Sequence, residues 1–178
     1  MNNITQVPHV NFRVRELGDW VDTNTDTYFK GKKVVVFSLP GAFTPTCSNQ
    51  QLPGFEKQAD VFKAHGIDEI YCMSVNDSFV MNAWARALRL EKVKLIPDGS
   101  GEFTKSLGML VNKPAEGFGM RSWRYSAYVE DREIIQFFEE PGLSESSPRM
   151  DDPYEVSDPE TMLKFLDGRL GYQHQKNK

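Results

Sequence analysis

The sequence predicts an α/β domain in which helices cover both faces of a central sheet. Val34–Leu39 and Glu69–Val75 are apolar almost throughout, which is typical of strands buried on both faces. A helical-looking segment follows each of these runs. The resulting β-α-β-α order favours parallel strands joined by right-handed crossovers. The chain has 178 residues, 39% hydrophobic and 26% charged, so we expect residues 1–178 to form one domain.

An N-terminal hairpin is expected before this core. Apolar and polar residues alternate over Val10–Arg15, which predicts a half-exposed strand. Gly18-Asp19 is a turn signal, and a partner strand is expected around Trp20 and Val21.

Two helices are expected within the core. The first covers residues 47–64, and Pro53-Gly54 should kink or split it. The second covers residues 79–90, with Asp77 or Ser78 as its N-cap. After it, residues 98–101 predict a loop and residues 102–107 a short helix.

The last part of the chain predicts a second hairpin and a final helix. The hairpin joins strands at 125–129 and 134–138, and the helix runs from Pro159 to Leu170, where Gly171 follows. Residues 141–158 are rich in Pro, Ser and acids, so we expect a surface loop. The whole order resembles the thioredoxin-like fold, with an N-terminal β-hairpin and a central mixed sheet flanked by helices.

Composition argues against several classes of function. The net charge is −4 and the basic residues form no stripe, so we expect no nucleic acid partner. No leader pattern opens the chain and no apolar run is long enough to span a membrane, so we expect a cytoplasmic protein without a membrane partner. His9, His65 and His174 lack ligand-type spacing, so no metal is expected.

Cys47 is the candidate for reactive chemistry. It lies in the loop Pro40–Ser48, where the first buried strand has ended and the next helix begins. Free backbone N–H groups and the helix dipole in a first helical turn favour an anion, here a thiolate. The alternative is a packed core cysteine. The hydroxyl residues Thr44, Thr46 and Ser48 favour the reactive interpretation.

A helix terminus alone is too weak to make a thiol reactive. An unperturbed thiol, with a pKa near 8.5, is only a few per cent thiolate at pH 7. Roughly nine-tenths thiolate requires about 3.4 kcal/mol of differential stabilisation. A helix terminus supplies ~0.3–1 kcal/mol, or up to ~2 kcal/mol when partly buried. The sequence therefore predicts a second cation beside Cys47.

Three ordered blocks of sequence resemble the peroxiredoxins, which are thiol peroxidases on a thioredoxin-like fold. Pro40, Thr44 and Cys47 match the Pro-x-x-x-Thr-x-x-Cys signature of that family. With Ser74–Asp77 and Arg121–Ser126 downstream, the pattern is similar to the peroxiredoxin-5 or type II group, including the peroxiredoxin part of bacterial peroxiredoxin-glutaredoxin hybrids. The resemblance covers roughly residues 5–170.

The resemblance implies a role for each signature residue. Cys47 would reduce hydrogen peroxide or alkyl hydroperoxides and become a sulfenic acid, with no bound cofactor. Thr44 would hydrogen-bond the peroxide and the sulfur, and Pro40 would shield the sulfenate. Arg124 would be the cation at the sulfur, in preference to Arg121. The plain alternatives are a cap residue for Thr44, a strand stop for Pro40 and a solvated charge for Arg124.

Cys72 is the only candidate for a resolving cysteine, because no cysteine follows it. It lies in the middle of the second buried strand, so we expect a packed core thiol. The resulting one-cysteine cycle needs an external thiol, and the resemblance implies glutathione as co-substrate with glutaredoxin acting as a separate protein. The alternative is a peroxidase recycled by thioredoxin, with Cys72 resolving the sulfenic acid.

The resemblance also implies a homodimer formed through the face that carries the Cys47 loop. Phe43, Phe79 and Trp84, with Arg121, are candidates for the rim of the substrate pocket or for the dimer contact. The alternative for these aromatic residues is core packing, because one helical-spacing set contains Val80, Met81, Trp84 and Leu88.

Two other functions fit the same fold. A redox sensor or chaperone would use oxidation of Cys47 to alter a partner interface. A disulfide oxidoreductase is disfavoured, because Ser48, Asn49 and Gln50 leave no Cys-x-x-Cys spacing.

Overall fold

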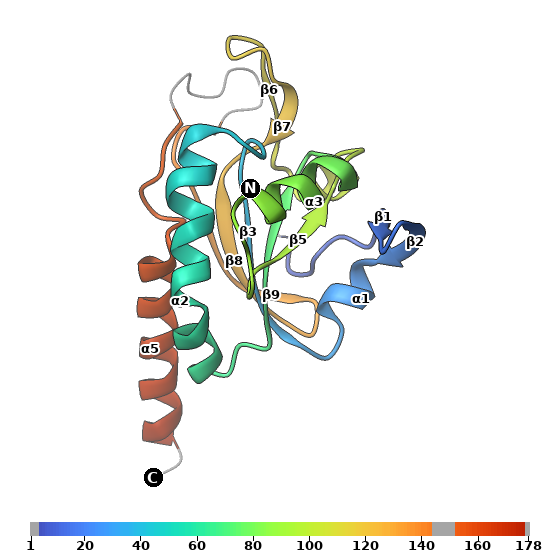
Figure 1. Cartoon of the computed structure of the whole chain (residues 1–178). Coiled ribbons are helices and arrows are strands. Elements are labelled where there is room, and N and C mark those ends of the chain that lie inside the picture. Colours follow the sequence, from blue (N-terminus) through green and yellow to red (C-terminus); the bar gives the residue numbers. More distant parts are fainter. Residues whose placement is uncertain (1–3, 144–151, 177–178) are drawn as a thin grey trace.

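The computed structural model describes residues 4–143 and 152–176. Its centre is a mixed sheet made of β3 (Lys33–Ser38), β4 (Glu69–Ser74), β5 (Lys94–Pro97), β8 (Tyr125–Glu130) and β9 (Glu133–Glu139). The spatial order is β5-β4-β3-β8-β9 (Figure 1). β4 is parallel to both β3 and β5, whereas β8 is antiparallel to both β3 and β9. The expected thioredoxin-like α/β fold with a mixed sheet is confirmed.

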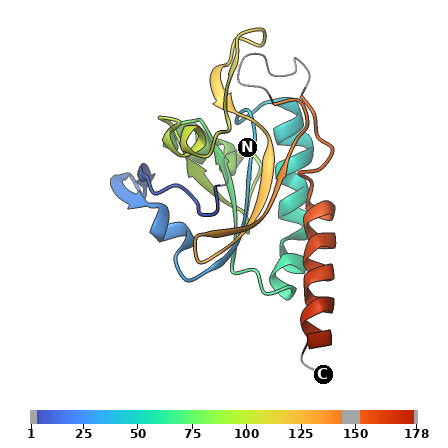
Figure 2. The same cartoon turned by 180° about the vertical axis from the view of Figure 1, so that it is seen from behind.

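Two small antiparallel hairpins lie outside this sheet: β1 (Asn11–Glu16) with β2 (Asp19–Asn24), and β6 (Leu110–Lys113) with β7 (Gly119–Ser122). The helices are α1 (Thr25–Phe29), α2 (Leu52–Ala64), α3 (Ser78–Ala87), α4 (Glu102–Ser106) and α5 (Pro159–Lys176). α2 and α5 run side by side along one face of the sheet (Figures 1 and 2). No helix in the described ranges is both long and apolar enough to cross a membrane.

Strands β3 and β4 are buried on both faces, so successive side chains enter two different cores. Val35 and Phe37 face the core that contains α2 and α5, and Phe37 stacks on Phe55 of α2 with ring centroids 4.1 Å apart. Val34 and Val36 face the second core, which contains β1, α1 and α4. This alternation explains why both strands read as unbroken apolar runs.

The helical segment expected over residues 47–64 has no break, and it changes type at Leu52, next to the irregularity predicted at Pro53-Gly54. A π-helical turn, η1 (Cys47–Gln51), comes first, and α2 begins at Leu52. Pro53 lies in the first turn of α2, so its missing N–H coincides with the change from π-helical to α-helical hydrogen bonding. The predicted cap of α3 is confirmed, because the Asp77 side chain accepts from the Val80 N–H at 2.9 Å.

Other boundaries differ from the sequence predictions. α5 passes the expected end at Leu170 and continues to Lys176. Gly171 does not adopt the left-handed conformation with which glycine ends helices, so it acts here as an ordinary helical residue. The sequence analysis also missed α1, β5, β6 and β7, because elements of four or five residues are too short to display a periodic pattern.

The expected loop over residues 141–158 is confirmed for residues 152–158, but part of that segment is buried and not at the surface. Residues 144–151 lie outside the described residues. Pro153 is buried, and Ser157 is fully buried. The buried Glu140 carboxylate accepts from the backbone N–H groups of Glu155, Val156 and Ser157 at 2.9 Å. The Glu140 side chain thus supplies the hydrogen-bond acceptors that backbone carbonyls would supply in a strand or helix. This allows part of a polar segment to be buried.

A histidine joins the two helices on the α2 face. His65, the C-cap of α2, places Nε2 2.6 Å from the Asp167 carboxylate of α5 and Nδ1 2.7 Å from the Val61 carbonyl. Both partners only accept hydrogen bonds, so both ring nitrogens must be protonated to satisfy them. The hydrogen bond to Asp167, followed by the one to Val61, raises the pKa of His65 above its usual 6.5.

Asp167→Asn should therefore destabilise the protein more at low pH than at high pH. Because the pKa of folded His65 is raised, its contribution is complete below the unfolded value of 6.5 and disappears as the pH rises through the folded pKa. We expect a loss of up to about 1 kcal/mol of unfolding free energy near pH 5.5, and a smaller loss near pH 9, by urea denaturation. Asp60→Asn removes the Lys92 ion pair and is the control, with an effect that stays constant over this range. Equal losses at both pH values for Asp167→Asn would contradict the prediction.

Candidate active site

Cys47 lies at the start of a widened helical turn. The chain becomes helical at Pro45, and Cys47 opens η1, in which the Leu52 N–H bonds to the Cys47 carbonyl. The structure thus places the thiol in a first helical turn, as expected. The π-helical geometry was not predicted, and such turns are frequent at functional sites. Cys47 is fully buried beneath the loop that precedes it.

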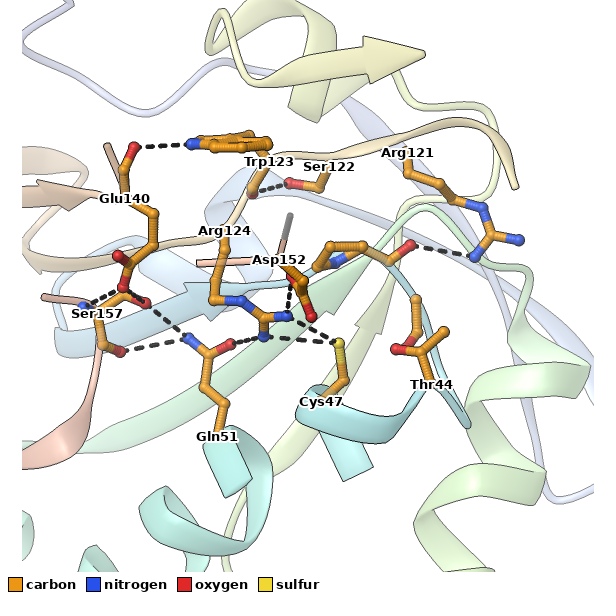
Figure 3. A network of polar contacts seen from close by, with 12 residues as sticks. Thr44, Cys47, Gln51, Arg121, Ser122, Trp123, Arg124, Glu140, Asp152 and Ser157 are labelled. Carbon is orange, nitrogen blue, oxygen red and sulfur yellow. Dashed lines mark hydrogen bonds and ion pairs between the residues drawn. The ribbon is translucent and has the colours of Figure 1, made fainter. Parts of the chain in front are cut away.

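Arg124 is the cation that the structure brings to the sulfur. It lies directly before β8, and both its Nη1 and Nη2 atoms are 3.6 Å from Cys47 Sγ (Figure 3). The guanidinium is almost completely buried, with 1% of the residue exposed. A buried positive charge at this distance interacts strongly with negative charge on the sulfur. The role of Arg124 in a reaction stays a prediction.

The guanidinium is held by three further groups. Nη1 donates to Gln51 Oε1 and Nη2 to Asp152 Oδ1, each at 2.6 Å, and Arg124 lies over the Tyr154 ring at 5.8 Å. Burial by itself lowers the pKa of Arg124, but Cys47 and Asp152 together outweigh that effect and raise it. The buried Nε has no hydrogen-bond partner among the described residues. The two Nη atoms therefore make all the hydrogen bonds of this guanidinium among the described residues.

Arg121 lies beside the Cys47 loop and makes its hydrogen bonds to backbone there. It donates from Nη1 to the Pro40 carbonyl at 3.1 Å and from Nε to the Phe118 carbonyl at 3.2 Å. A Cβ at Gly41 would lie 2.3 Å from that Nη1, so any larger residue at this position would displace the Arg121 guanidinium. Thr44 lies in the same loop, where its hydroxyl donates to the Gly41 carbonyl at 2.7 Å. Arg121 therefore fastens the loop in which Pro40 and Thr44 lie.

The sequence blocks Ser74–Asp77 and Arg121–Ser126 also hold the site by hydrogen bonds. Asn76 Oδ1 accepts from the Ala42 N–H at 3.0 Å and from the Ser74 hydroxyl at 2.6 Å, which ties the Cys47 loop to the end of β4. Ser38, the last residue of β3, donates to the Ser122 hydroxyl at 2.8 Å. All three blocks that carried the resemblance thus meet around Cys47.

The three candidate aromatic residues have different surroundings. Phe43 is 55% exposed and adopts a left-handed φ of 65°, a strained conformation for a bulky residue in the Cys47 loop. Phe79 is also exposed, and it packs edge-on against Trp20 of the N-terminal hairpin. Trp84 is fully buried and donates from Nε1 to the Ser48 hydroxyl at 3.0 Å. The prediction of Trp84 at a surface rim is therefore wrong, because it is a core residue beneath the site.

Cys72 is a packed thiol in β4, opposite Phe37 of β3. It is fully buried, and both cysteines are free thiols. Burial raises the pKa of Cys72 well above its usual value, Cys47 adds to the rise, and Arg124 partly opposes it. At neutral pH this thiol is therefore protonated and a poor nucleophile.

The contacts of Gln51, Asp152 and Tyr154 with Arg124 were not predicted from the sequence. Gln51 follows Cys47 by four residues, so helical spacing could have placed the two side chains on one face. Asp152 and Tyr154 carry no such signal, since they reach Arg124 only through the path of the segment before α5. Among residues 4–143 and 152–176, no group of three or more His, Cys, Asp or Glu could hold a metal ion.

Known proteins resemble this chain over most of its length. The Redoxin family matches residues 5–152. A peroxiredoxin from Sinorhizobium fredii is 55% identical over 170 residues, which cover 90% of this chain and 89% of that protein. The hybrid peroxiredoxin hyPrx5 of Haemophilus influenzae is 51% identical over 161 residues, covering 90% of this chain and 64% of that protein.

A solved structure extends the comparison to three dimensions. The reduced form of Prx3 from Vibrio vulnificus in complex with hydrogen peroxide has a TM-score of 0.82 and 36% identity to this chain. The match covers 93% of this chain and 99% of that one. The similarity therefore includes the complete fold as well as the sequence blocks.

Arg124→Met should slow alkylation of Cys47 by iodoacetamide about tenfold near pH 7, as expected if the lost cation contributes about 1.4 kcal/mol to the thiolate. The deficit should shrink at high pH, where the thiol ionises without help. Arg121→Met is the matched control, because Arg121 bonds the Pro40 and Phe118 carbonyls. We expect it to change the rate much less. Equal effects of the two substitutions at neutral pH would contradict the assignment of the cation.

Proposed function

This chain belongs to the Redoxin family as a peroxiredoxin of the type II or peroxiredoxin-5 group, and we propose that Cys47 is the nucleophile of its thiol peroxidase activity. The observation that carries the proposal is the contact of the buried Arg124 guanidinium with Cys47 Sγ at 3.6 Å. The substrates are hydrogen peroxide and organic hydroperoxides. The similarity to a Prx3 structure that contains hydrogen peroxide supports this substrate class.

In the first step the Cys47 thiolate attacks one oxygen of the peroxide. A sulfur–oxygen bond forms, the oxygen–oxygen bond breaks, and sulfur is oxidised by two electrons to a sulfenic acid. The other oxygen leaves as water or an alcohol after taking a proton. Arg124 stabilises the thiolate and the charge that moves onto the leaving oxygen through the Nη1 and Nη2 atoms that contact the sulfur. Thr44 and Pro40, in the fastened loop, position the peroxide and shield the sulfenate.

In the second step an external thiol regenerates Cys47. It attacks the sulfenic sulfur, releases water and forms a mixed disulfide, and a second thiol then breaks that disulfide. The overall change converts one peroxide and two thiols to one alcohol or water, one water and one disulfide. Cys72 is a poor candidate for the resolving thiol, because its pKa is raised and its strand would have to leave the core.

The external reductant in this proposal is glutathione with glutaredoxin. Cys47 is fully buried, so a thiol of that size requires the η1 turn to open before it can attack. The similarity to a hybrid peroxiredoxin, of which this chain matches 64%, supports a partner unit outside the matched region. Thioredoxin, with Cys72 as resolving cysteine, is the alternative reductant.

Two matched serine substitutions test the proposal. We expect Cys47→Ser to lose all peroxide turnover and Cys72→Ser to retain it, when peroxide consumption is measured with glutathione plus glutaredoxin. Each variant is also assayed with thioredoxin plus its reductase. Loss of activity in Cys72→Ser would make Cys72 the resolving cysteine, and turnover only with thioredoxin would overturn the proposed reductant. Full activity in Cys47→Ser would remove Cys47 as nucleophile.

The homodimer is part of the same proposal, with Phe43 at its contact. This aromatic side chain is more than half exposed on the Cys47 loop, although its backbone is strained. Burial against a second copy would stabilise an exposed aromatic ring in such a position.

Phe43→Glu should therefore convert a dimer to a monomer, because a charge in an apolar contact costs desolvation energy. Sedimentation equilibrium of the wild type and the variant measures this change. Leu17→Glu is the control, because Leu17 is exposed in the turn between β1 and β2 and should not alter the mass. A monomeric wild type would remove the dimer from the proposal.

A further inference from the structure

Glu140 is a fully buried carboxyl group that does not touch Cys47 or Arg124 with its side chain. It lies directly after β9, and its carboxylate accepts from the Ser157 hydroxyl at 2.8 Å as well as from three backbone N–H groups. Its own backbone is fixed too, since its N–H donates to the Arg124 carbonyl and its carbonyl accepts from Trp123 Nε1. Glu140 therefore has one defined position beside the active site.

Ser157 passes this constraint to Gln51. Gln51 Nε2 donates to both the carbonyl and the hydroxyl oxygen of Ser157, each at 3.3 Å. A carbonyl can only accept, so the amide nitrogen of Gln51 must face Ser157. The amide oxygen then faces the other way, where Arg124 Nη1 donates to it at 2.6 Å.

A continuous polar chain thus leads from Glu140 to the sulfur. Figure 3 shows the order Glu140, Ser157, Gln51, Arg124 and Cys47. The first four residues are at most 1% exposed, so little water competes for these contacts. Buried polar networks whose members are satisfied hold their groups in one arrangement.

Arg124 has two side-chain acceptors at 2.6 Å, and of these Gln51 is the fully buried one. The Asp152 side chain is 38% exposed, so solvent reaches this acceptor but does not reach Gln51. An arginine side chain has several rotatable bonds, and an acceptor with a fixed direction limits where its planar fork can lie.

We propose that Glu140 is a positioning residue for the Cys47 reaction, which fixes the Arg124 guanidinium at the sulfur through Ser157 and Gln51. This inference rests on the proposed peroxidase function. A displacement of the guanidinium by a fraction of an ångström weakens its hold on both the thiolate and the leaving oxygen, and rates are sensitive to such shifts.

The chain contains a matched control for this role. Glu56 of α2 also accepts from three consecutive backbone N–H groups, those of Glu91, Lys92 and Val93, at 2.7 to 3.3 Å. Its contacts hold the 91–93 loop and have no connection to Arg124. Glu56→Gln and Glu140→Gln therefore each remove a carboxylate from three backbone N–H groups, with Glu56 at a partly exposed position and Glu140 at a fully buried one.

The experiment compares the two variants in single-turnover oxidation by hydrogen peroxide and in the pH profile of Cys47 alkylation. For Glu140→Gln we expect the second-order oxidation rate to fall about tenfold and the alkylation profile to move to higher pH. For Glu56→Gln we expect both to stay within about twofold of the wild type. An unchanged rate and profile in Glu140→Gln, with only a loss of thermal stability, would overturn the proposal.

A double substitution tests the route. If Glu140 acts through Gln51, then Gln51→Met with Glu140→Gln should be no slower than Gln51→Met alone, and additive effects would overturn the route. Should Glu140→Gln fail to fold, Ser157→Ala breaks the same link while leaving the backbone contacts. Measuring the alkylation profile requires no peroxide, so it tests the positioning role separately from the proposed function. If Cys47→Ser retained peroxidase activity, the proposed function would be refuted, and the alkylation profile would still report on the positioning of Arg124.

Discussion

The burial of the Arg124 guanidinium is the constraint on which the rest of the site depends. A charged group that is 1% exposed is costly unless it is paired and hydrogen-bonded. Here the compensation comes from the Cys47 sulfur, the Gln51 amide and the Asp152 carboxylate. The same desolvation that makes the cation costly strengthens its effect on a thiol at 3.6 Å. Reactivity and structural cost therefore have one physical origin.

Satisfying this cation requires segments that are far apart in the sequence. Cys47 and Gln51 come from η1, Arg124 precedes β8, and Asp152 comes from the segment before α5. The pairing of β3 with β8 brings the η1 turn and Arg124 together, since Ser38 and Tyr125 are partners at the end of these two strands. The Glu140 carboxylate holds the segment before α5 by accepting hydrogen bonds from the backbone N–H groups of that segment. The sheet and one buried carboxylate thus assemble a site that no single element contains.

Particular residues show how far sequence reasoning reached. The apolar runs of β3 and β4, the cap at Asp77 and the position of Cys47 in a first helical turn all follow from local patterns. The need for a second cation followed from energetic arithmetic, and the resemblance directed attention to Arg124. Trp84 shows the limit of the method, because helical spacing alone does not reveal whether an aromatic residue lies beneath the surface or on it.

The sequence by itself determined the fold class, the candidate thiol and the chemical type of its neighbour, because these depend on local periodicity and on the intrinsic chemistry of each side chain. Only the tertiary structure decided which arginine meets the sulfur, that Asp152 and Tyr154 contact that arginine, and that a π-helical turn carries Cys47. The physical reason is that these features arise from burial and hydrogen bonding between distant segments. A buried donor or acceptor takes whichever partner the fold brings near, and the sequence around it does not record that partner.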